Sequence, residues 1–277
     1  MKTVLLILMA LIFSKCMTSN QESKNYLGND VRLFRDTPVW DIANAIADED
    51  SKKVKQLVMN TSKNVLNYQE KKFGQSLLIW SVYSGYYKGF KILIDSGVDI
   101  NIKAYDSTQA INWAANVYET SDYLKELIKR KANVNYIANN NEAIYLRTPL
   151  IAAANSSFEN TKILVEAGAD VNYSYSEKGY HASPLYSAFL RGNIDVIRYL
   201  IMVAKVDPKR CLETKFDGED LFAVDLLRTL TFDIGSKEYK KKMEVVDFLM
   251  KQGVNYRKTP IPLHFYKLYD KSYLEKY

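Results

Sequence analysis

The sequence predicts an all-α solenoid of about six helix-turn-helix units, with short hairpin fingers between units and a C-terminal capping helix. A hydrophobic residue followed by asparagine recurs along the chain, at Asn67, Asn101, Asn135, Asn172 and Asn255. The first two intervals are 34 residues each and the third is 37. Between these marks, apolar residues recur at helical spacing, as in VIRYLI. One such unit cannot bury its apolar stripe alone, so we expect the units to stack into a common core.

The units also match one another in order along the chain. The first begins at Thr37, the second is GQSLLIWSVYSGYYKGFKILIDSGVDIN, and the third begins QAINWAAN. The fourth begins TPLIAAAN, the fifth SPLYSAFL, and the looser sixth starts at Asp220. Threonine or serine before Pro-Leu supplies an oxygen for the helix N-terminus, and proline stands where its missing N–H costs nothing. Gly85 and Gly97 follow the two helices of the second unit, so each unit is predicted to hold two helices.

These units resemble ankyrin repeats over about residues 37–256. Thr148-Pro149-Leu150 and Ser183-Pro184-Leu185 resemble the start of the T-P-L-H motif of that family, and Ser76 stands at its threonine position. The resemblance implies recognition of another protein through a concave face and the fingers. We expect a monomer with no cofactor.

Residues 1–16 have the pattern of a signal peptide. Lys2 precedes the apolar run Val4 to Phe13, which is too short to span a bilayer, since a span needs about 20 residues. Cys16 resembles the lipidated cysteine of bacterial lipoproteins, although that family has a small residue where this chain has Lys15. Ordinary signal-peptidase cleavage beside Ser14 is the alternative. We expect an exported protein of a bacterium, in the periplasm or as an outer-membrane lipoprotein that meets the membrane only through its lipid.

Two further segments flank the repeats. Residues 17–36 are predicted to form a polar tether and an N-terminal cap. Residues 257–277 begin like a seventh unit, with Pro262, Leu263 and His264, and are predicted to form one charged capping helix. Insertions at 136–147 and 231–242 lengthen the period, and the lysines of the second insertion are typical of a solvated loop.

The sequence shows no arrangement typical of catalysis or metal binding. The two histidines, His181 and His264, stand in different units, and no phosphate-binding loop or nucleophile elbow occurs. The stretch DVNYSYSEKGYH at 170–181 begins like a calcium loop, but Tyr175 and His181 stand where that loop needs glycine and glutamate. Cys211 has no partner for an intramolecular disulfide once Cys16 is set aside. We therefore expect no enzyme.

Charge and aromatic content favour a protein partner. The formal net charge is +6, but both signs alternate without a long basic run, so nucleic acid is not an expected partner. There are 21 tyrosines against 11 phenylalanines, and tyrosine offers large contact area at low cost in side-chain entropy. Composition bias is the alternative explanation for part of this excess. The candidate protein-binding residues are Tyr68, Tyr83, Tyr105, Tyr136, Tyr145, Arg147, Tyr173, Tyr175, Tyr180 and His181.

The functional hypothesis is an exported protein-binding module. Its concrete form is an envelope immunity protein that neutralises a secreted antibacterial effector, for example one of the lipase type. The alternatives are an envelope adaptor that supports a periplasmic enzyme, and an effector that binds a host protein.

Overall fold

The computed structural model describes residues 25–277 except 140–143, 178–179 and 216. The predicted signal peptide, Cys16 and the first part of the predicted tether lie outside the described residues. The chain divides into two compact units, Met1–Ala110 and Ile111–Tyr277, which are described in turn.

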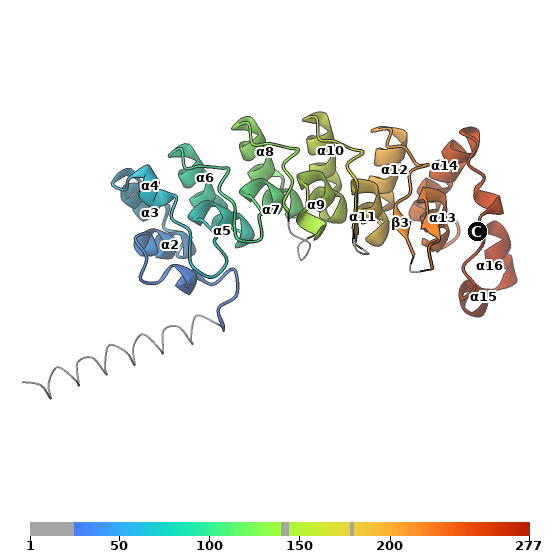
Figure 1. The fold of residues 1–277 in the computed structure, drawn as a ribbon, viewed down its shortest axis with the longest axis horizontal. Helices are drawn as coiled ribbons and strands as arrows, with labels where there is room; N and C mark the ends of the chain where they lie inside the picture. Colours follow the sequence, from blue (N-terminus) through green and yellow to red (C-terminus); the bar gives the residue numbers. More distant parts are fainter. Residues whose placement is uncertain (1–24, 140–143, 178–179, 216) are drawn as a thin grey trace, which may run out of the picture. The chain divides into compact units, whose positions relative to one another are not determined.

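The first unit holds two pairs of antiparallel helices, α2 with α3 and α5 with α6 (Figure 1). In its core, the ring of Phe34 meets Trp80 edge to face at 5.4 Å, and Phe90 is fully buried. Burying such large apolar side chains supplies most of the stabilisation of a repeat. The elements are η2 (Val31–Phe34), α2 (Trp40–Ala47), α3 (Ser51–Met59), α4 (Lys63–Leu66), α5 (Leu77–Tyr83) and α6 (Tyr87–Asp95).

The second unit holds four helix pairs and two short hairpins, and only the first residue of α7 falls outside it. Leu185, Ile197, Leu227 and Leu249 are among the apolar side chains of its continuous core. Its elements are α7 (Ala110–Asn116), α8 (Asp122–Lys129), η3 (Ile144–Leu146), α9 (Pro149–Ser156), α10 (Phe158–Glu166), β1 (Tyr175–Glu177), β2 (Tyr180–Ala182), α11 (Pro184–Leu190), α12 (Ile194–Met202), β3 (Glu213–Thr214), β4 (Asp220–Leu221), α13 (Ala223–Thr229), α14 (Lys237–Lys251), η4 (Tyr256–Lys258), α15 (Phe265–Leu268) and α16 (Lys271–Lys276).

The six helix pairs of the described residues confirm the predicted number of units. The predicted N-caps are confirmed as well, because Ser76, Thr148 and Ser183 each accept a hydrogen bond from the backbone N–H three residues on. Gly85 and Gly97 both have positive φ, as helix-ending glycines do. In the part of the chain that the structure describes, no helix has the length and apolar content that crossing a bilayer requires.

Within each unit, the recurring asparagine joins one repeat to the next at Asn67, Asn135 and Asn172. Asn67 Oδ1 accepts a hydrogen bond from the backbone N–H of Asp99 at 3.0 Å in the first unit. In the second unit, Asn135 Oδ1 accepts from Asp170 at 2.7 Å, and Asn172 Oδ1 accepts from Asp207 at 3.3 Å. We call the surroundings of such an asparagine a joint. The motif asparagine is thus an acceptor that fixes the distance between consecutive repeats.

The aspartates of these joints hold their own turns. Asp170 Oδ1 accepts from the backbone N–H of Asn172 at 2.9 Å, and Asp99 and Asp207 do the same two residues on. The stretch that begins like a calcium loop is therefore a joint followed by the β1–β2 hairpin, whose register pairs Ser176 with His181.

Two segments differ from the prediction. Residues 257–277 form two short helices, α15 and α16, instead of one, because Pro260 and Pro262 restrict the entry and Asp270 starts a new helix by accepting from the N–H of Tyr273. The lysines of the second insertion, expected in a solvated loop, instead lie in the first part of helix α14. The expectation is wrong for Lys242, which is fully buried and donates from Nζ to the carbonyl of Leu230 at 2.8 Å.

Candidate functional site

A buried arginine organises two of the candidate tyrosines in the second unit. The side chain of Arg147 is supplied by the chain just before α9, and only 5% of the residue is exposed. Its Nε donates to the hydroxyl oxygen of Tyr173 at 2.8 Å, and Nη2 donates to Oδ1 of Asn139 at 3.3 Å. The guanidinium carbon also lies 3.5 Å from the centre of the Tyr175 ring, a close cation–π contact. The two tyrosines are thus held in fixed positions before any partner arrives.

The insertion at 136–147 brings Arg147 to this place. The backbone N–H of Ala138 donates to the carbonyl of Arg147 at 2.8 Å, so the two ends of the insertion meet. The 3-10 helix η3 precedes Arg147 and lies next to strand β2. Tyr145, in η3, is 43% exposed, and Tyr136 is half-buried. The insertion therefore supports the finger that follows it in the stack.

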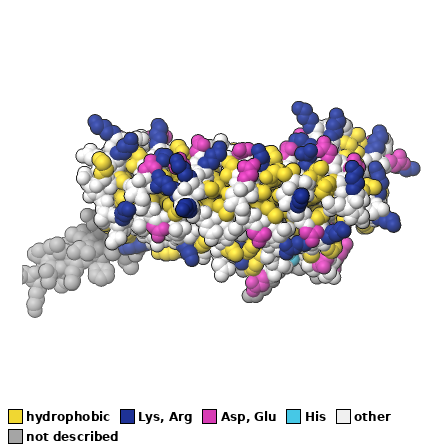
Figure 2. Space-filling view, turned by 90° about the horizontal axis from the view of Figure 1, so that it is seen from above, with side chains coloured by type: hydrophobic (Ala, Val, Ile, Leu, Met, Phe, Trp, Pro, Cys, Tyr) yellow, Lys and Arg dark blue, Asp and Glu magenta, His cyan; other side chains and the backbone are white. Residues whose placement is uncertain are grey.

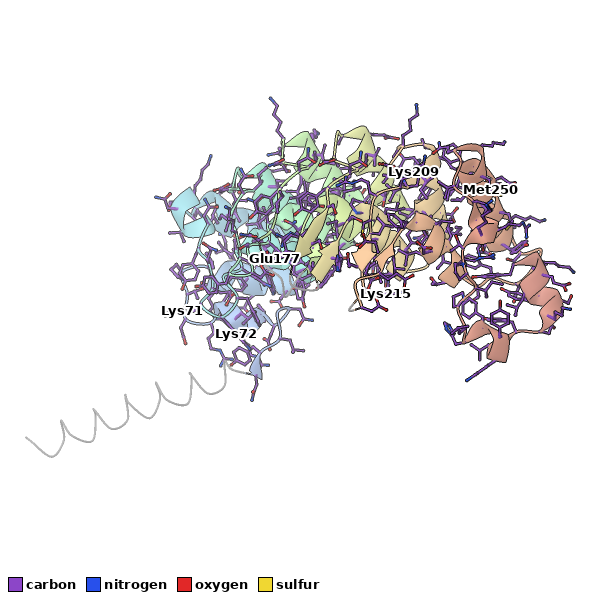
Figure 3. The ribbon with its side chains drawn as sticks, turned by 45° about the vertical axis from the view of Figure 1, so that its right-hand side comes forward. Lys71, Lys72, Glu177, Lys209, Lys215 and Met250 are labelled. Atoms are coloured by element: carbon purple, nitrogen blue, oxygen red, sulfur yellow. The ribbon has the colours of Figure 1, made fainter. Side chains whose placement is uncertain are left out.

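The β1–β2 hairpin carries the remaining candidates of this region. The hydroxyl of Tyr175 donates to Oε2 of Glu177 at 3.0 Å, and Figure 3 marks Glu177 on this hairpin. The ring of His181 meets that of Tyr186 edge to face at 6.4 Å. Burial, aided by the charge of Glu213, raises the pKa of Tyr186 to about 12, so this phenol stays neutral at any physiological pH. Tyr180 lies in β2, opposite Glu177.

A cleft of about 300 Å³ opens beside Tyr173, at the joint of Asn135. Its polar lining includes Asn135, Thr148 and Asp170, and Val134 and Ile137 contribute apolar walls. We call it the Asn135 cleft. Its volume lies at the lower end of the roughly 300 to 1,000 Å³ that sites for small-molecule ligands enclose, so it has room for one long side chain of a partner.

The candidates of the first unit do not form one cluster. Tyr105, 68% exposed, lies over Gly74, where a Cβ atom would stand 2.5 Å from its ring. Tyr83 lies against Gly28, and Tyr68 is half-buried. Tyr105 and Tyr83 therefore pack against different parts of the unit.

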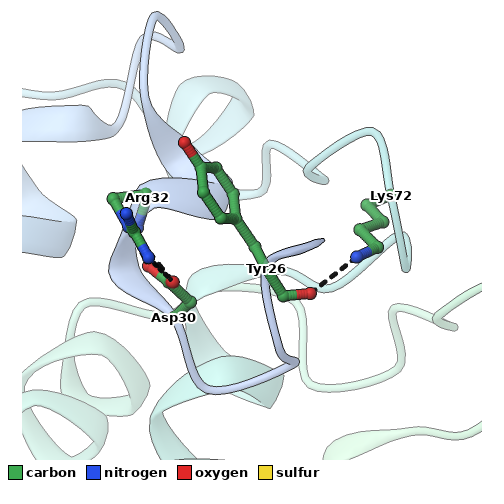
Figure 4. A network of polar contacts seen from close by, with 4 residues as sticks. All are labelled: Tyr26, Asp30, Arg32 and Lys72. Atoms are coloured by element: carbon green, nitrogen blue, oxygen red, sulfur yellow. Dashed lines mark hydrogen bonds and ion pairs between the residues drawn. The ribbon is translucent and has the colours of Figure 1, made fainter. Parts of the chain in front are cut away.

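The N-terminal segment covers part of this unit. Figure 4 shows Lys72 donating from Nζ to the carbonyl of Tyr26 at 2.6 Å. Arg32 pairs with Asp30 and also lies over the Tyr26 ring, 4.4 Å from its centre. Because Gly28 contacts Tyr83, the segment already occupies part of the surface expected to be open.

The structure thus brings Arg147, Tyr173 and Tyr175 together, with His181 on the same hairpin. Sequence reasoning did not select Asn135, Thr148 or Asp170 as site residues. Comparing the same repeat position from unit to unit is the signal that could have found them. In the space-filling view of Figure 2, acidic and basic side chains are interspersed, with apolar atoms between them. Among the described residues, no group of three or more histidine, cysteine or acidic side chains is placed to hold a metal ion.

Comparisons with known proteins agree with this architecture. The family model described as ankyrin repeats in three copies matches residues 111–210. The chain carries ankyrin repeats. A crystal structure titled as that of EF0377, an ankyrin repeat protein, is similar with a TM-score of 0.56 and 24% sequence identity. The similarity covers 76% of this chain and 97% of that one. The search of curated proteins found no significant match.

Ankyrin repeats are protein–protein interaction modules, and their fold is typically a binding scaffold without catalytic residues. The fold class predicted from the sequence, an ankyrin-repeat solenoid, is confirmed. The contacts of Arg147 make its finger the best-organised of the candidate regions.

Proposed function

We propose that this ankyrin-repeat protein is exported to the bacterial envelope, where it binds and neutralises one specific protein, such as a secreted antibacterial effector of the lipase type. The observation that carries the binding part is the pair Tyr173 and Tyr175, fixed by the buried Arg147 beside the Asn135 cleft. A rigid aromatic pair, one member of which lines a cleft, suits a protein interface because little side-chain freedom is lost on binding.

The envelope part of the proposal is supported by the sequence. Lys2 and the apolar run Val4 to Phe13 favour export, and Cys16 is either a lipidation site or a residue beside a cleavage site. Neutralisation is favoured over catalysis because the candidate residues offer aromatic contact area and no paired acid and base.

Two alternatives share the binding site and differ in the partner. An envelope adaptor would bind an enzyme of the same cell and sustain its activity. An effector would bind a protein of a host cell, and lipidation at Cys16 would disfavour this role because a lipidated protein stays with the membrane.

An affinity comparison tests the proposal. The immobilised protein and its Tyr173→Ala/Tyr175→Ala variant are exposed in parallel to the secreted and periplasmic proteins of the source bacterium. We expect one protein to be retained by the first and lost from the second. With that partner purified, calorimetry should show binding at least about 100-fold weaker for the variant, as expected for two interfacial hot spots.

Tyr118→Ala is the matched control, because Tyr118 is a 73% exposed tyrosine of the same unit that lies outside the fingers. It should leave binding unchanged. Equal binding by the finger variant and the unaltered protein would refute the proposed surface. Killing of cells that lack the protein by sibling cells that carry it would support neutralisation, whereas loss of an endogenous enzyme activity would support the adaptor.

A further inference from the structure

At two joints, a side chain of the chain itself reaches the backbone carbonyl of the motif asparagine. At Asn101, in the first unit, Gln109 donates from Nε2 to that carbonyl at 2.7 Å. Gln109 stands immediately before the first helix of its repeat. The carboxamide of Gln109, at the start of the following helix, thus fills this joint.

At Asn172, in the second unit, the filler comes from a different place. Arg210 donates from Nη1 to the carbonyl of Asn172, and it stands three residues after Asp207, the aspartate of the next joint. Arg210, Asp207 and Asn172 line the same small space, which is closed to about 10 Å³. Here a guanidinium fills the joint, with a carboxylate among its neighbours.

At Asn135 both routes are blocked. Thr148 stands at the repeat position of Gln109, but its side chain is short and its hydroxyl accepts from the N–H of Ile151 as the N-cap of α9. Tyr173 stands at the repeat position of Arg210, three residues after Asp170, and its hydroxyl bonds to Arg147 instead. The corresponding space beside Asn135 therefore stays open. It is the Asn135 cleft, about 300 Å³ in volume.

The lining of the cleft indicates what would fill it. Asn135 and Asp170 correspond to Asn172 and Asp207, which surround Arg210 in the next joint. Val134 and Ile137 add apolar surface that suits the methylene stem of a long side chain. A carboxylate selects a cationic donor over a neutral one, and a planar guanidinium also matches several acceptors at once.

We propose that the Asn135 cleft receives an arginine side chain of the partner protein, which takes the place that Arg210 takes at the following joint. This inference rests on the proposed function, since the arginine belongs to the protein that the fingers bind. Arg147 does not fill the same role, because its Nε is directed to the Tyr173 hydroxyl and its guanidinium lies over the Tyr175 ring. The partner is thus a protein with an exposed arginine on a protruding segment.

The test is a titration of the isotope-labelled full-length protein with three capped tripeptides, acetyl-Gly-X-Gly-amide, in which X is arginine, citrulline or glutamate. Backbone amide shifts are recorded by nuclear magnetic resonance. Arginine should shift the amides of Asn135, Thr148, Asp170 and Tyr173, with about tenfold weaker binding by citrulline, which has the same length without the charge. Stronger shifts of the same amides by the glutamate peptide would overturn the proposal in favour of an anion site.

Two variants sharpen the result. Asp170→Asn keeps an oxygen that can accept from Asn172 but removes the charge, so arginine binding should fall about tenfold. Asp99→Asn makes the same change at the joint of Asn67, outside the cleft, and should have no effect. Tyr173→Arg, which restores the filler seen at Asn172, should abolish peptide binding. Unchanged binding in both cleft variants would overturn the proposal.

The outcomes separate this inference from the proposed function. If a captured partner depends on Tyr173 and Tyr175 but ignores Asp170→Asn, the protein-binding proposal stands and the arginine proposal fails. If no partner depends on the tyrosines while the arginine peptide binds as described, the cleft is correctly assigned and the proposed function fails.

Discussion

Arg147 donates a hydrogen bond from Nε to the hydroxyl of Tyr173 at 2.8 Å, and this contact helps to join the insertion at 136–147 to the finger that follows α10. It fixes Tyr173 as one wall of the Asn135 cleft. It also keeps a buried cation satisfied, since an unpaired buried charge is costly.

Arg147→Met should therefore lower the free energy of unfolding by about 2 to 3 kcal/mol, the range for losing charged hydrogen bonds in a buried place. Tyr173→Phe removes only the hydroxyl and should cost about 1 to 2 kcal/mol, mostly from the donor left on Arg147. Urea denaturation measures both. If Arg147→Met were as stable as the unaltered protein, the arginine would not organise the finger.

Asn160 supplies a second test in the same unit. It is fully buried, and its Nδ2 donates to the carbonyl of Ala115 at 3.1 Å, in the last turn of α7, and to that of Val117 at 2.7 Å, just beyond the helix end. Asn160→Ala should cost about 2 to 3 kcal/mol, because the carbonyls at this helix end lose their donor in a buried place. Asn155→Ala, on α9, is the comparison, and an equal loss in both variants would contradict the specific role of Asn160.

Gly74→Ala in the first unit should cost more than Gly85→Ala. Both glycines have positive φ, near +70° and +82°, so each alanine pays about 1 to 2 kcal/mol of backbone strain. Only at Gly74 would the new Cβ meet a ring, that of Tyr105, at 2.5 Å, whereas nothing lies within 4 Å of a Cβ at Gly85. Thermal unfolding of the two variants gives the difference, and equal melting temperatures would show that Tyr105 moves away freely.

Lys242 should make stability rise with pH. Its burial, together with the charge of Arg228, lowers the pKa of Lys242 to about 6 from an ordinary value of 10.5. Between these values the unfolded chain binds the extra proton, so the free energy of unfolding increases with pH by up to about 1.4 kcal/mol per pH unit.

The upper end of this window is set by tyrosines. Burial raises the pKa of Tyr256 to about 12 and raises that of Tyr277 as well. The contribution of these two neutral phenols to the free energy of unfolding is therefore complete below about pH 10 and is lost as the pH rises further. Urea denaturation from pH 6 to pH 10 should show the rise. Lys242→Met should flatten it and stabilise the protein at pH 7 by about 1 to 4 kcal/mol. Lys240→Met, at an exposed position of α14, should preserve the slope; a slope unaffected by Lys242→Met would contradict the assignment.

The parts of the fold that the sequence predicts well are those set by local chemistry. Thr148 and Ser183 cap their helices because a hydroxyl oxygen before Pro-Leu can accept a hydrogen bond from a free backbone N–H of the first helical turn. The spacing of Asn67, Asn135 and Asn172 predicts the repeats because each of these asparagines accepts the same hydrogen bond, from the backbone N–H of an aspartate in the next repeat.

The parts that the sequence does not predict depend on side chains far apart in the chain. Lys242 looks like one of several solvated lysines, but it is a core residue because it packs against Tyr277, whose ring centre lies 3.6 Å from its amine, and bonds to the carbonyl of Leu230. Tyr173 is one of many finger tyrosines until its bond to Arg147, 26 residues away, is known. The Asn135 cleft is open because the side chains equivalent to Gln109 and Arg210 do not fill it, and no local sequence pattern marks a side chain that is missing.

The asparagine bonds at the joints have a consequence for how such a chain can change in length. Each bond spans one unit, 32 residues from Asn67 to Asp99 and 35 residues both from Asn135 to Asp170 and from Asn172 to Asp207. Duplication or loss of a whole unit would leave each of these three asparagines with a backbone N–H of the next repeat from which to accept. Recombination between units can therefore add or remove binding surface while the rest of the protein keeps its folded contacts.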